Sequence, residues 1–348
     1  MKRSSLRHCF FVAIVVSTIA LVLFGIIMIK LSEMGIFDDT NSIMASSTDN
    51  QSQWLDFFKD NAPEIELSGD SVIKLDNIDN YEEPGYTAED DVDGNLTDSV
   101  QTELTKINDY NYQMSYTVQD SAGNVTTKTR DIRVIIGIVC LTFDDGPSTE
   151  ITPQILDILQ EKGVNATFFV NNYSEDKAYL IKREDEEGNV VGFHGYSHEY
   201  SEIYSDINTL MTNFYKIEDL VYQTIGKDSK LIRFPGGTSN TVSKEYCEGI
   251  MSAAIQRVTD EGYIYVDWNI DSNDAGSDAQ NSEAIYSNVV QGLEPSRTNV
   301  VLMHDRAEKQ ATADALPNII DYCIENGYDI QTITSETSLK SSQHHPNN

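Results

Sequence analysis

The chain has 348 residues, with 24 lysines and arginines against 56 aspartates and glutamates, and a formal net charge of −32. This length allows one large domain and a smaller one, because single domains usually contain ~100–200 residues. A surface this acidic repels phosphate backbones, so the composition argues against nucleic acid as a partner.

The N-terminal segment contains a long apolar run. Residues 9–28 carry no charged side chain, and ~20 such residues are enough to cross a bilayer as a helix. Lys2, Arg3 and Arg7 precede the run, which predicts a cytoplasmic N-terminus. A cleaved signal peptide is the alternative, although its apolar region usually has only ~7–15 residues. We therefore expect residues 1–30 to form a cytoplasmic tip and a single-pass transmembrane signal-anchor in the cell membrane, with the rest of the chain extracellular.

The next two segments differ in composition. Residues 31–61 are rich in Ser, Asp, Asn and Gln without periodicity, which predicts a linker. Residues 62–135 alternate apolar and polar side chains between Gly, Asp and Asn turns. This alternation predicts a small antiparallel β-sandwich.

Closely spaced carboxylates within the predicted sandwich have two interpretations. Calcium sites use such groups, whereas acidic residues also form turns on many surfaces. The residues concerned are Glu89, Asp90, Asp91, Asp93 and Asp98.

Residues 136–337 have the pattern of an α/β domain. Seven apolar segments are candidate strands, near residues 138–143, 166–170, 190–193, 231–234, 263–267, 299–303 and 329–333. Amphipathic helices between them end at glycines, namely Gly163, Gly226 and Gly327. This alternation predicts a parallel sheet covered by helices, closed as a barrel or open, with functional side chains at the strand ends. The last residues, 338–348, are expected to be a disordered tail.

Two polar motifs follow predicted strands. Asp144 and Asp145 come directly after the first strand, although one of them could simply cap the following helix. His194 and His198 follow the third strand, spaced so that one helical turn presents both rings to one point. Paired imidazoles near a carboxylate pair suit a divalent metal ion. We therefore predict a metal site at this end of the sheet.

The motifs of this region also have a distinctive order. They are TFDDGP at 142–147, HGYSH at 194–198, RFPGG at 233–237, WNIDSND at 268–274 and LMHD at 302–305. In this order they resemble the polysaccharide deacetylases with a NodB homology domain, carbohydrate esterase family 4, over roughly residues 137–335. The resemblance implies a distorted (β/α) barrel that acts as a metal-dependent hydrolase. The preceding β-rich segment resembles the immunoglobulin-like modules of bacterial surface proteins.

The resemblance implies a role for each motif residue. Asp145, His194 and His198 would bind the divalent metal, zinc in the first place, with cobalt or another ion as alternatives. Asp144 would be the general base, and Arg233 would pair with it and orient it.

Further residues would complete the site by the same resemblance. His304 would be the general acid that protonates the departing amine, and Asp274 would support its ring. For the substrate, Leu302 would line the pocket of the acetyl methyl, the backbone N–H near Gly236 would stabilise the oxyanion, and Pro235 and Trp268 would contact the glycan.

Two positions depart from the family pattern. Gly195 stands where Ser or Thr is common, and its missing hydroxyl predicts a slightly looser histidine loop. Ala275 stands where many members have a tryptophan that walls the groove.

The expected function is hydrolysis of N-acetyl groups on a cell-surface polysaccharide, with N-acetylglucosamine of peptidoglycan as the expected substrate. Two alternatives remain open. Relatives of this fold also cleave O-acetyl esters of xylan-type sugars, and a catalytically inactive chain would serve as a glycan-binding surface protein.

Overall fold

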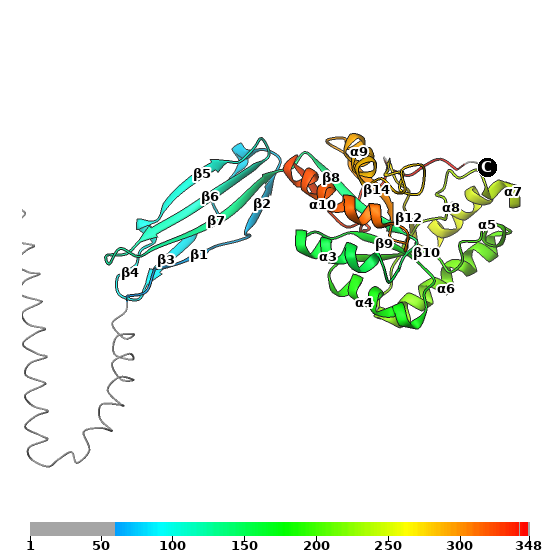
Figure 1. Ribbon diagram of the computed structural model, residues 1–348, viewed down its shortest axis with the longest axis horizontal. Coiled ribbons are helices and arrows are strands. Elements are labelled where there is room, and N and C mark those ends of the chain that lie inside the picture. The colour runs from blue at the N-terminus through cyan, green and yellow to red at the C-terminus, as the bar shows by residue number, and fades with distance from the viewer. Residues whose placement is uncertain (1–59, 341, 347–348) are drawn as a thin grey trace, which may run out of the picture.

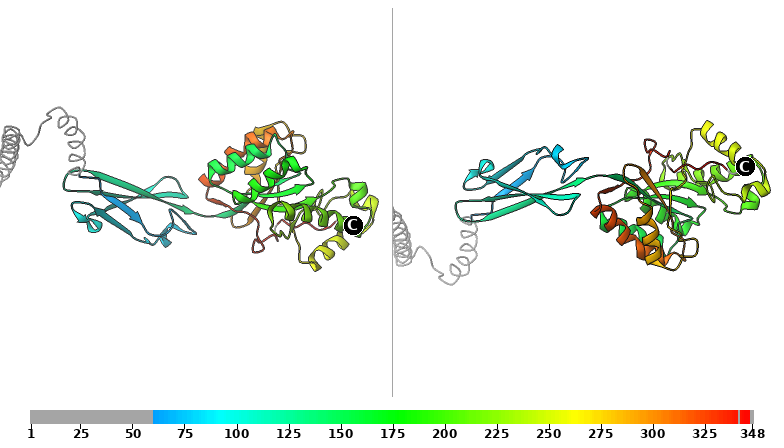
Figure 2. Two further views of the ribbon diagram at one scale, coloured as in Figure 1. Left: turned by 90° about the horizontal axis from the view of Figure 1, so that it is seen from below. Right: turned by 90° about the horizontal axis from the view of Figure 1, so that it is seen from above.

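The computed structural model describes residues 60–340 and 342–346. Two folded bodies follow one another along the chain, first a flat β-module and then a parallel sheet covered by helices (Figures 1 and 2). The last strand of the module continues after residues 135–136 into the first strand of the second body.

The β-module consists of two small sheets. One sheet has the order β1-β3-β4 and the other the order β2-β7-β6-β5. Their bounds are β1 Glu64–Leu67, β2 Val72–Leu75, β3 Tyr86–Asp90, β4 Gly94–Asn95, β5 Gln101–Lys106, β6 Asn111–Gln119 and β7 Val125–Val134, with short 3₁₀ turns at Ile78–Asn80 and Thr97–Ser99. The core between the sheets contains Ile65, Ala88, Tyr116 and Val118.

One pairing in the module differs from the predicted antiparallel pattern. β2 lies parallel to β7, with Ile73 opposite Ile132. The difference arises because β1 and β2 belong to different sheets although they are neighbours in sequence. A chain that changes sheets in this way places β2 beside the last strand rather than beside β1.

The second body is built on a parallel sheet with the order β12-β11-β10-β9-β8-β14-β13. Its strands are β8 Gly137–Asp144, β9 Thr167–Asn171, β10 Val190–Gly195, β11 Leu231–Ile232, β12 Ile264–Tyr265, β13 Ile270–Asp271, β14 Thr298–His304 and β15 Tyr328–Ile330. β8 is the central strand, because its first half pairs with β15 and its second half with β9, while β14 pairs along its other edge.

Helices connect these strands and pack on the sheet (Figure 1). Their bounds are α3 Thr152–Lys162, α4 Ala178–Glu186, α5 Tyr200–Ile203, α6 Ile207–Ile225, α7 Ser243–Tyr246, α8 Ile250–Asp260, α9 Ser282–Gly292 and α10 Gln310–Glu325, with a 3₁₀ turn at Glu175–Lys177. The sequence explains the ends of α6. Asp206 caps its N-terminus through the N–H groups of Asn208 and Thr209, and Gly226 ends it in the left-handed conformation at φ 69°.

The two faces of the sheet have different contents. Leu141 and Phe143 of β8 belong to the large core that the helices cover. Cys140, which points to the opposite face, belongs to a smaller cluster with Ile333 and Leu339. Because side chains alternate along a strand, Thr142 and Asp144 share the face of Cys140. Polar side chains at the end of β8 are therefore presented on the face that the helices leave open.

The predicted barrel is confirmed only as a curled parallel sheet. β12 and β13 form the two ends of the strand order, so the sheet is an open half-barrel rather than a closed one. The physical reason is the length of its outer strands, since β11, β12 and β13 contain two residues each. Strands this short offer too few backbone groups to close a barrel.

The C-terminal segment differs from the expected disordered tail. Leu339 is 7% exposed and Ser342 is fully buried. The backbone N–H of His344 donates to Asp267 at 2.9 Å, and its ring packs edge-on against Trp268. The described part of this segment therefore lies on the second body. Leu339 explains the difference, because burying its side chain stabilises the docked segment.

Several contacts join the two bodies. Arg133 Nη2 donates to the carbonyl of Tyr328 at 2.8 Å, and Lys74 Nζ lies 2.7 Å from Asp329 Oδ1. The side-chain amide of Asn111 donates to the carbonyl of Ile324, at the C-terminal end of α10. The module is therefore attached at the N-terminal edge of the parallel sheet, opposite to the strand ends that carry the predicted motifs.

The acidic residues considered for calcium lie partly in one cluster. Carboxylate oxygens of Asp60, Asp90 and Asp91 lie within 4.8 Å of one another. Asp90 Oδ1 also accepts hydrogen bonds from the N–H groups of Val92 and Asp93, at 2.9 and 2.8 Å. Asp90 therefore stabilises the turn that connects β3 to β4. The calcium interpretation stays a prediction.

The predicted localisation is corrected by the helices of the structure. Across residues 60–340 and 342–346, no helix is both long enough and apolar enough to cross a membrane. This finding contradicts the predicted single-pass membrane localisation. The predicted cytoplasmic tip and anchor, residues 1–30, and residues 31–59 of the predicted linker lie outside the described residues.

Candidate active site

The structure brings the predicted motifs together at the carboxyl ends of neighbouring parallel strands. Asp144 ends β8 and lies opposite His304, which ends β14. His194 lies near the end of β10, and Asp274 follows β13. Parallel strands place their carboxyl ends at one edge of a sheet. Residues 160 positions apart in the chain can therefore act on one substrate.

Three of the predicted residues form a possible metal-binding cluster. Ligand atoms of Asp145, His194 and His198 lie within 4.8 Å of one another. Asp145 Oδ1 is 3.5 Å from His194 Nε2 and 3.7 Å from His198 Nε2. His194 Nδ1 lies 2.8 Å from the carbonyl of Arg233, which can only accept, so this nitrogen carries the proton and Nε2 is free to bind. Two imidazoles and one carboxylate fit a divalent metal such as zinc.

Asp145 is held in an unusual backbone conformation. Its φ is 74°, a region that residues other than glycine adopt rarely and often at functional sites. Asn171 Nδ2 donates to its Oδ1 at 2.9 Å, and Arg306 Nη1 lies 3.5 Å from its Oδ2. Burial alone would raise the pKa of Asp145, but the positive charges of His194, His198 and Arg306 lower it overall. The carboxylate is therefore ionised at neutral pH.

His198 is the most exposed member of the cluster. Partial burial, and then the neighbouring His194, lower its pKa from the ordinary value. A lower pKa favours the neutral imidazole at neutral pH, which is the form that binds a metal. Its ring also packs against the ring of Tyr200, with centroids 5.2 Å apart.

The second predicted pair, Asp144 and Arg233, is buried beside the cluster. Arg233 is fully buried, and its Nη1 donates to Asp144 Oδ1 at 2.7 Å and to Thr142 Oγ1 at 2.8 Å. The rest of the guanidinium donates to the carbonyls of Val266 and Asp267. These bonds fix Asp144, whose second oxygen faces His194 Nε2 at 4.0 Å.

The third predicted pair is His304 with Asp274. His304 Nδ1 lies 2.7 Å from Asp274 Oδ1, and the N–H of His304 donates to Asp274 Oδ2 at 2.8 Å. Thr312 Oγ1 also donates to Oδ2, and Lys309 Nζ donates to the carbonyl of Asp274. Burial alone would lower the pKa of His304, but the hydrogen bond and charge of Asp274, with the charges of the Asp144–Asp145 pair, raise it overall.

The residues predicted to contact the substrate lie around these groups. Leu302 is buried and lies two positions before His304 on β14, so both side chains share one face of the strand. Pro235 is buried and its carbonyl accepts the hydroxyl of Tyr204 at 2.7 Å. Gly236 is exposed at φ 77°, and a Cβ there would come within 2.7 Å of the hydroxyl of Tyr200.

Trp268, the remaining predicted contact, is half-buried. Its ring lies 5.7 Å from the guanidinium carbon of Arg233. A Cβ at Gly237 would come within 2.8 Å of the same ring, so the glycine allows the close packing.

Some residues of the site were missed by sequence reasoning. Thr142 and Asp267 support Arg233, and Thr312 supports Asp274. Thr142 is the first residue of the TFDDGP motif at 142–147, so its position offered a signal. Thr312 offered none, because a single threonine within a helix is ordinary.

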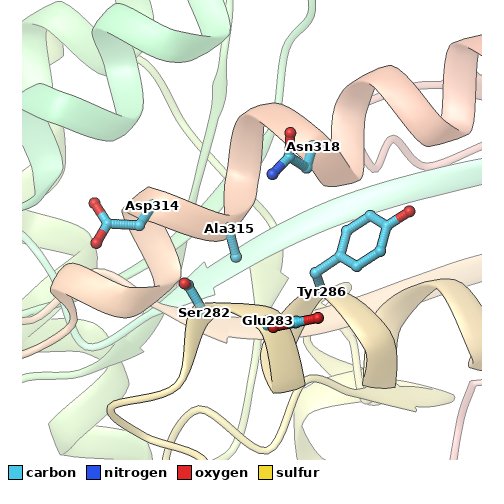
Figure 3. Close-up of a pocket in the computed structure, with 6 residues that line it drawn as sticks. All are labelled: Ser282, Glu283, Tyr286, Asp314, Ala315 and Asn318. Atoms are coloured by element: carbon cyan, nitrogen blue, oxygen red, sulfur yellow. The ribbon is translucent and has the colours of Figure 1, made fainter.

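A cavity also occurs away from this site. It has a volume of about 360 Å³ and lies between α9 and α10, where side chains of both helices face it (Figure 3). Its lining contains none of the predicted residues and consists of Ser282, Glu283, Tyr286, Asp314, Ala315 and Asn318.

Comparisons with known proteins agree with this arrangement. The family described as polysaccharide deacetylase matches residues 134–250, and the family of bacterial surface protein Ig-like domains matches residues 65–134. Among solved structures, the catalytic domain of peptidoglycan N-acetylglucosamine deacetylase from Eubacterium rectale is 38% identical. It is similar over 61% of this chain and 94% of its own, with a TM-score of 0.57.

Two curated relatives cover the same part of the chain. The Bacillus subtilis protein YheN, named among the polysaccharide deacetylases, is 33% identical over 55% of this chain, which spans 64% of the length of YheN. A peptidoglycan-N-acetylglucosamine deacetylase of Bacillus cereus is 31% identical over 57% of this chain and 67% of its own length. Together with the strand-end site, these similarities confirm the resemblance that the motif order indicated. The chain belongs to the polysaccharide deacetylase family of carbohydrate esterases, with a bacterial Ig-like module before its deacetylase domain.

Proposed function

We propose that this protein hydrolyses N-acetyl groups of a hexosamine polymer, with N-acetylglucosamine of peptidoglycan as its substrate. The observation that carries the proposal is that Asp144 and His304, paired at the ends of adjacent strands, lie at the same edge of the sheet as the Asp145–His194–His198 cluster. Each of the two has its own buried partner, Arg233 and Asp274. The names of the Eubacterium rectale and Bacillus cereus relatives support the choice of peptidoglycan.

The cluster of Asp145, His194 and His198 would hold one divalent metal, with zinc as the first choice. When bound, such an ion supplies Lewis acidity, which polarises the acetyl carbonyl and favours ionisation of water. The carbonyl of Arg233 fixes the ring of His194 so that Nε2 faces the cluster. In many proteins, a hydrogen bond to the ring nitrogen that does not bind the metal orients a metal-binding histidine.

Asp144 would act as the general base. Arg233 occupies its Oδ1, so the side chain cannot rotate away, and Oδ2 faces the cluster. The base takes a proton from the attacking water while the new C–O bond forms. The backbone N–H near Gly236 would stabilise the oxyanion that develops on the acetyl group.

His304 would act as the general acid. Asp274 Oδ1 accepts a hydrogen bond from Nδ1–H, which leaves Nε2 to face the substrate. The raised pKa of His304 favours the protonated ring, the form that a general acid needs. Nε2 gives its proton to the departing amine as the C–N bond breaks, which yields acetate and a free amino sugar. Leu302 would contact the acetyl methyl, and Pro235 and Trp268 would contact the sugar.

The first test measures acetate released by the purified full chain. With zinc present, we expect acetate from N-acetylglucosamine oligomers and from peptidoglycan, and chelation should abolish it. O-acetylated xylan oligomers serve as the comparison substrate. Faster release from xylan than from either amide substrate would identify an esterase and overturn the proposed substrate class. Absence of acetate from all three substrates would favour a glycan-binding protein.

The second test uses the pH dependence of Asp274→Asn. Activity requires an ionised base and a protonated acid, so rate against pH is expected to be bell-shaped. Asp274 raises the pKa of His304, so its neutralisation lowers that pKa and the alkaline limb should move to lower pH. The acidic limb reports the base and should keep its position. A shift of the acidic limb alone would contradict these assignments.

A further inference from the structure

Asn213, a residue of α6 outside all the motifs, makes two hydrogen bonds to the histidine loop. Its Oδ1 accepts the backbone N–H of Ser197 at 2.6 Å, and its Nδ2 donates to the carbonyl of Ser197 at 3.1 Å. Asn213 is 6% exposed. A single buried amide therefore satisfies both backbone groups of the residue that precedes His198.

The loop that carries His198 needs such an attachment. Residues 196–199 belong to no strand or helix, so strand pairing does not hold them. The loop has further attachments. Lys216 Nζ lies over the ring of Tyr196, 5.5 Å from its centroid, and the hydroxyl of Ser197 donates to Glu202 at 2.8 Å. That bond lies at the exposed surface, where a hydrogen bond contributes little. The buried amide of Asn213 is the stronger attachment.

The space beside Gly195 is taken by the same amide. A Cβ on Gly195 would lie 2.7 Å from Asn213 Nδ2 and 2.9 Å from the carbonyl of Ser197. Both distances are too short for a side chain to fit without displacement. Gly195 and Asn213 are therefore complementary, because the absence of a side chain at one position makes room for the amide from the other.

We propose that Asn213 is a positioning residue of the metal cluster, which fixes the backbone at Ser197 and thereby the direction of His198. The inference rests on the proposed metal site. His198 Nε2 must stay near Asp145 Oδ1, from which it is 3.7 Å away, and a freely moving loop would lose conformational entropy whenever it binds the ion. Asn213 removes that cost before the ion arrives.

The experiment measures zinc affinity of the full chain by competition with a chromophoric chelator. Asn213→Ala removes both bonds, and Asn213→Leu removes them while keeping the branched shape of the side chain. Both variants are expected to bind zinc ~10–100-fold more weakly, the usual effect of losing an outer partner of a metal ligand. The visible spectrum of the cobalt-loaded protein should change in both, because the ligand geometry is no longer fixed.

Two comparisons separate positioning from folding. Asn208→Ala, at an exposed position of the same helix, should keep wild-type zinc affinity. Thermal unfolding of the metal-free variants measures their fold independently of zinc. If Asn213→Ala does not fold, Asn213→Leu decides the question. Wild-type affinity and cobalt spectrum in Asn213→Leu would overturn the inference, because packing alone would then hold the loop.

A third comparison distinguishes this inference from the proposed metal site itself. His198→Ala should lose far more zinc affinity than either Asn213 variant. If His198→Ala binds zinc as the wild type does, the proposed metal site is wrong. If His198→Ala loses zinc while both Asn213 variants keep it, the metal site stands and the positioning role of Asn213 is wrong.

Discussion

Replacement of His198 by alanine is expected to abolish deacetylation. Turnover of N-acetylglucosamine oligomers should fall by more than about 10³-fold, because an outer partner of a ligand alone costs ~10–100-fold and His198 would be a ligand itself. Zinc affinity should fall with the activity. The reason is geometric, since only Asp145 and His194 of the cluster would remain to hold the ion.

The fold should survive this replacement. The side chain of His198 is 39% exposed, so its removal leaves no buried cavity of the kind that destabilises a core. His345→Ala is the matched control, because His345 is an exposed histidine outside the site and should keep both zinc affinity and turnover. Acetate release and zinc competition are measured on both variants. Undiminished turnover in His198→Ala would exclude the cluster as the catalytic metal site.

Much of the second body could be predicted from local patterns. β8 and β14 are continuous apolar strands, and α6 has a capping aspartate and a terminal glycine. Each of these patterns spans only a few consecutive residues, so it can be recognised in the sequence alone. β13 was missed because it has only two residues, Ile270 and Asp271. Its pairing with β14 depends on tertiary packing, which no short window of sequence records.

The site was predictable to the same extent and for the same reason. Asp144, His194 and His304 lie at the carboxyl ends of their strands and Asp145 follows directly, and the parallel sheet brings these strand ends together. Their supporting partners come from elsewhere in the chain. Thr312 reaches Asp274 from α10, and Asn213 reaches Ser197 from α6. Polar residues of this kind look like ordinary helix residues until the packing of the helix is known.

Buried partners hold the proposed base, Asp144, and the proposed acid, His304, in fixed positions. Arg233 has Asp144, Thr142 and two carbonyls around its guanidinium, so the proposed base is held by a cation that is itself fixed. Asp274 is fixed in the same way by Thr312 and by the backbone of His304. In the proposed mechanism, each proton-transfer group would therefore have one atom bound by its partner and one atom left for the substrate or the attacking water. This division makes separate tests of base and acid possible.

His304→Ala is expected to lower turnover of N-acetylglucosamine oligomers by ~10²–10⁴-fold, the usual contribution of a positioned acid or base. An amine is a poor leaving group unless it is protonated, and His304 is the proposed proton donor. Zinc affinity should remain at the wild-type value, because His304 is not a member of the Asp145–His194–His198 cluster. The loss should therefore appear in kcat at saturating zinc.

The leaving group provides the decisive comparison for His304. The aryl oxide of an activated aryl acetate departs with little need for a proton. Hydrolysis of this ester by His304→Ala should therefore fall much less than hydrolysis of the amide. Asp144→Asn is the matched variant, because attack by water needs the base with either substrate, and its losses on amide and ester should be similar. Rates of acetate release and of aryl alcohol release measure the two substrates under the same conditions. Equal losses on both substrates in His304→Ala would show that this histidine does not protonate the leaving group, and the roles of acid and base would then have to be reassigned.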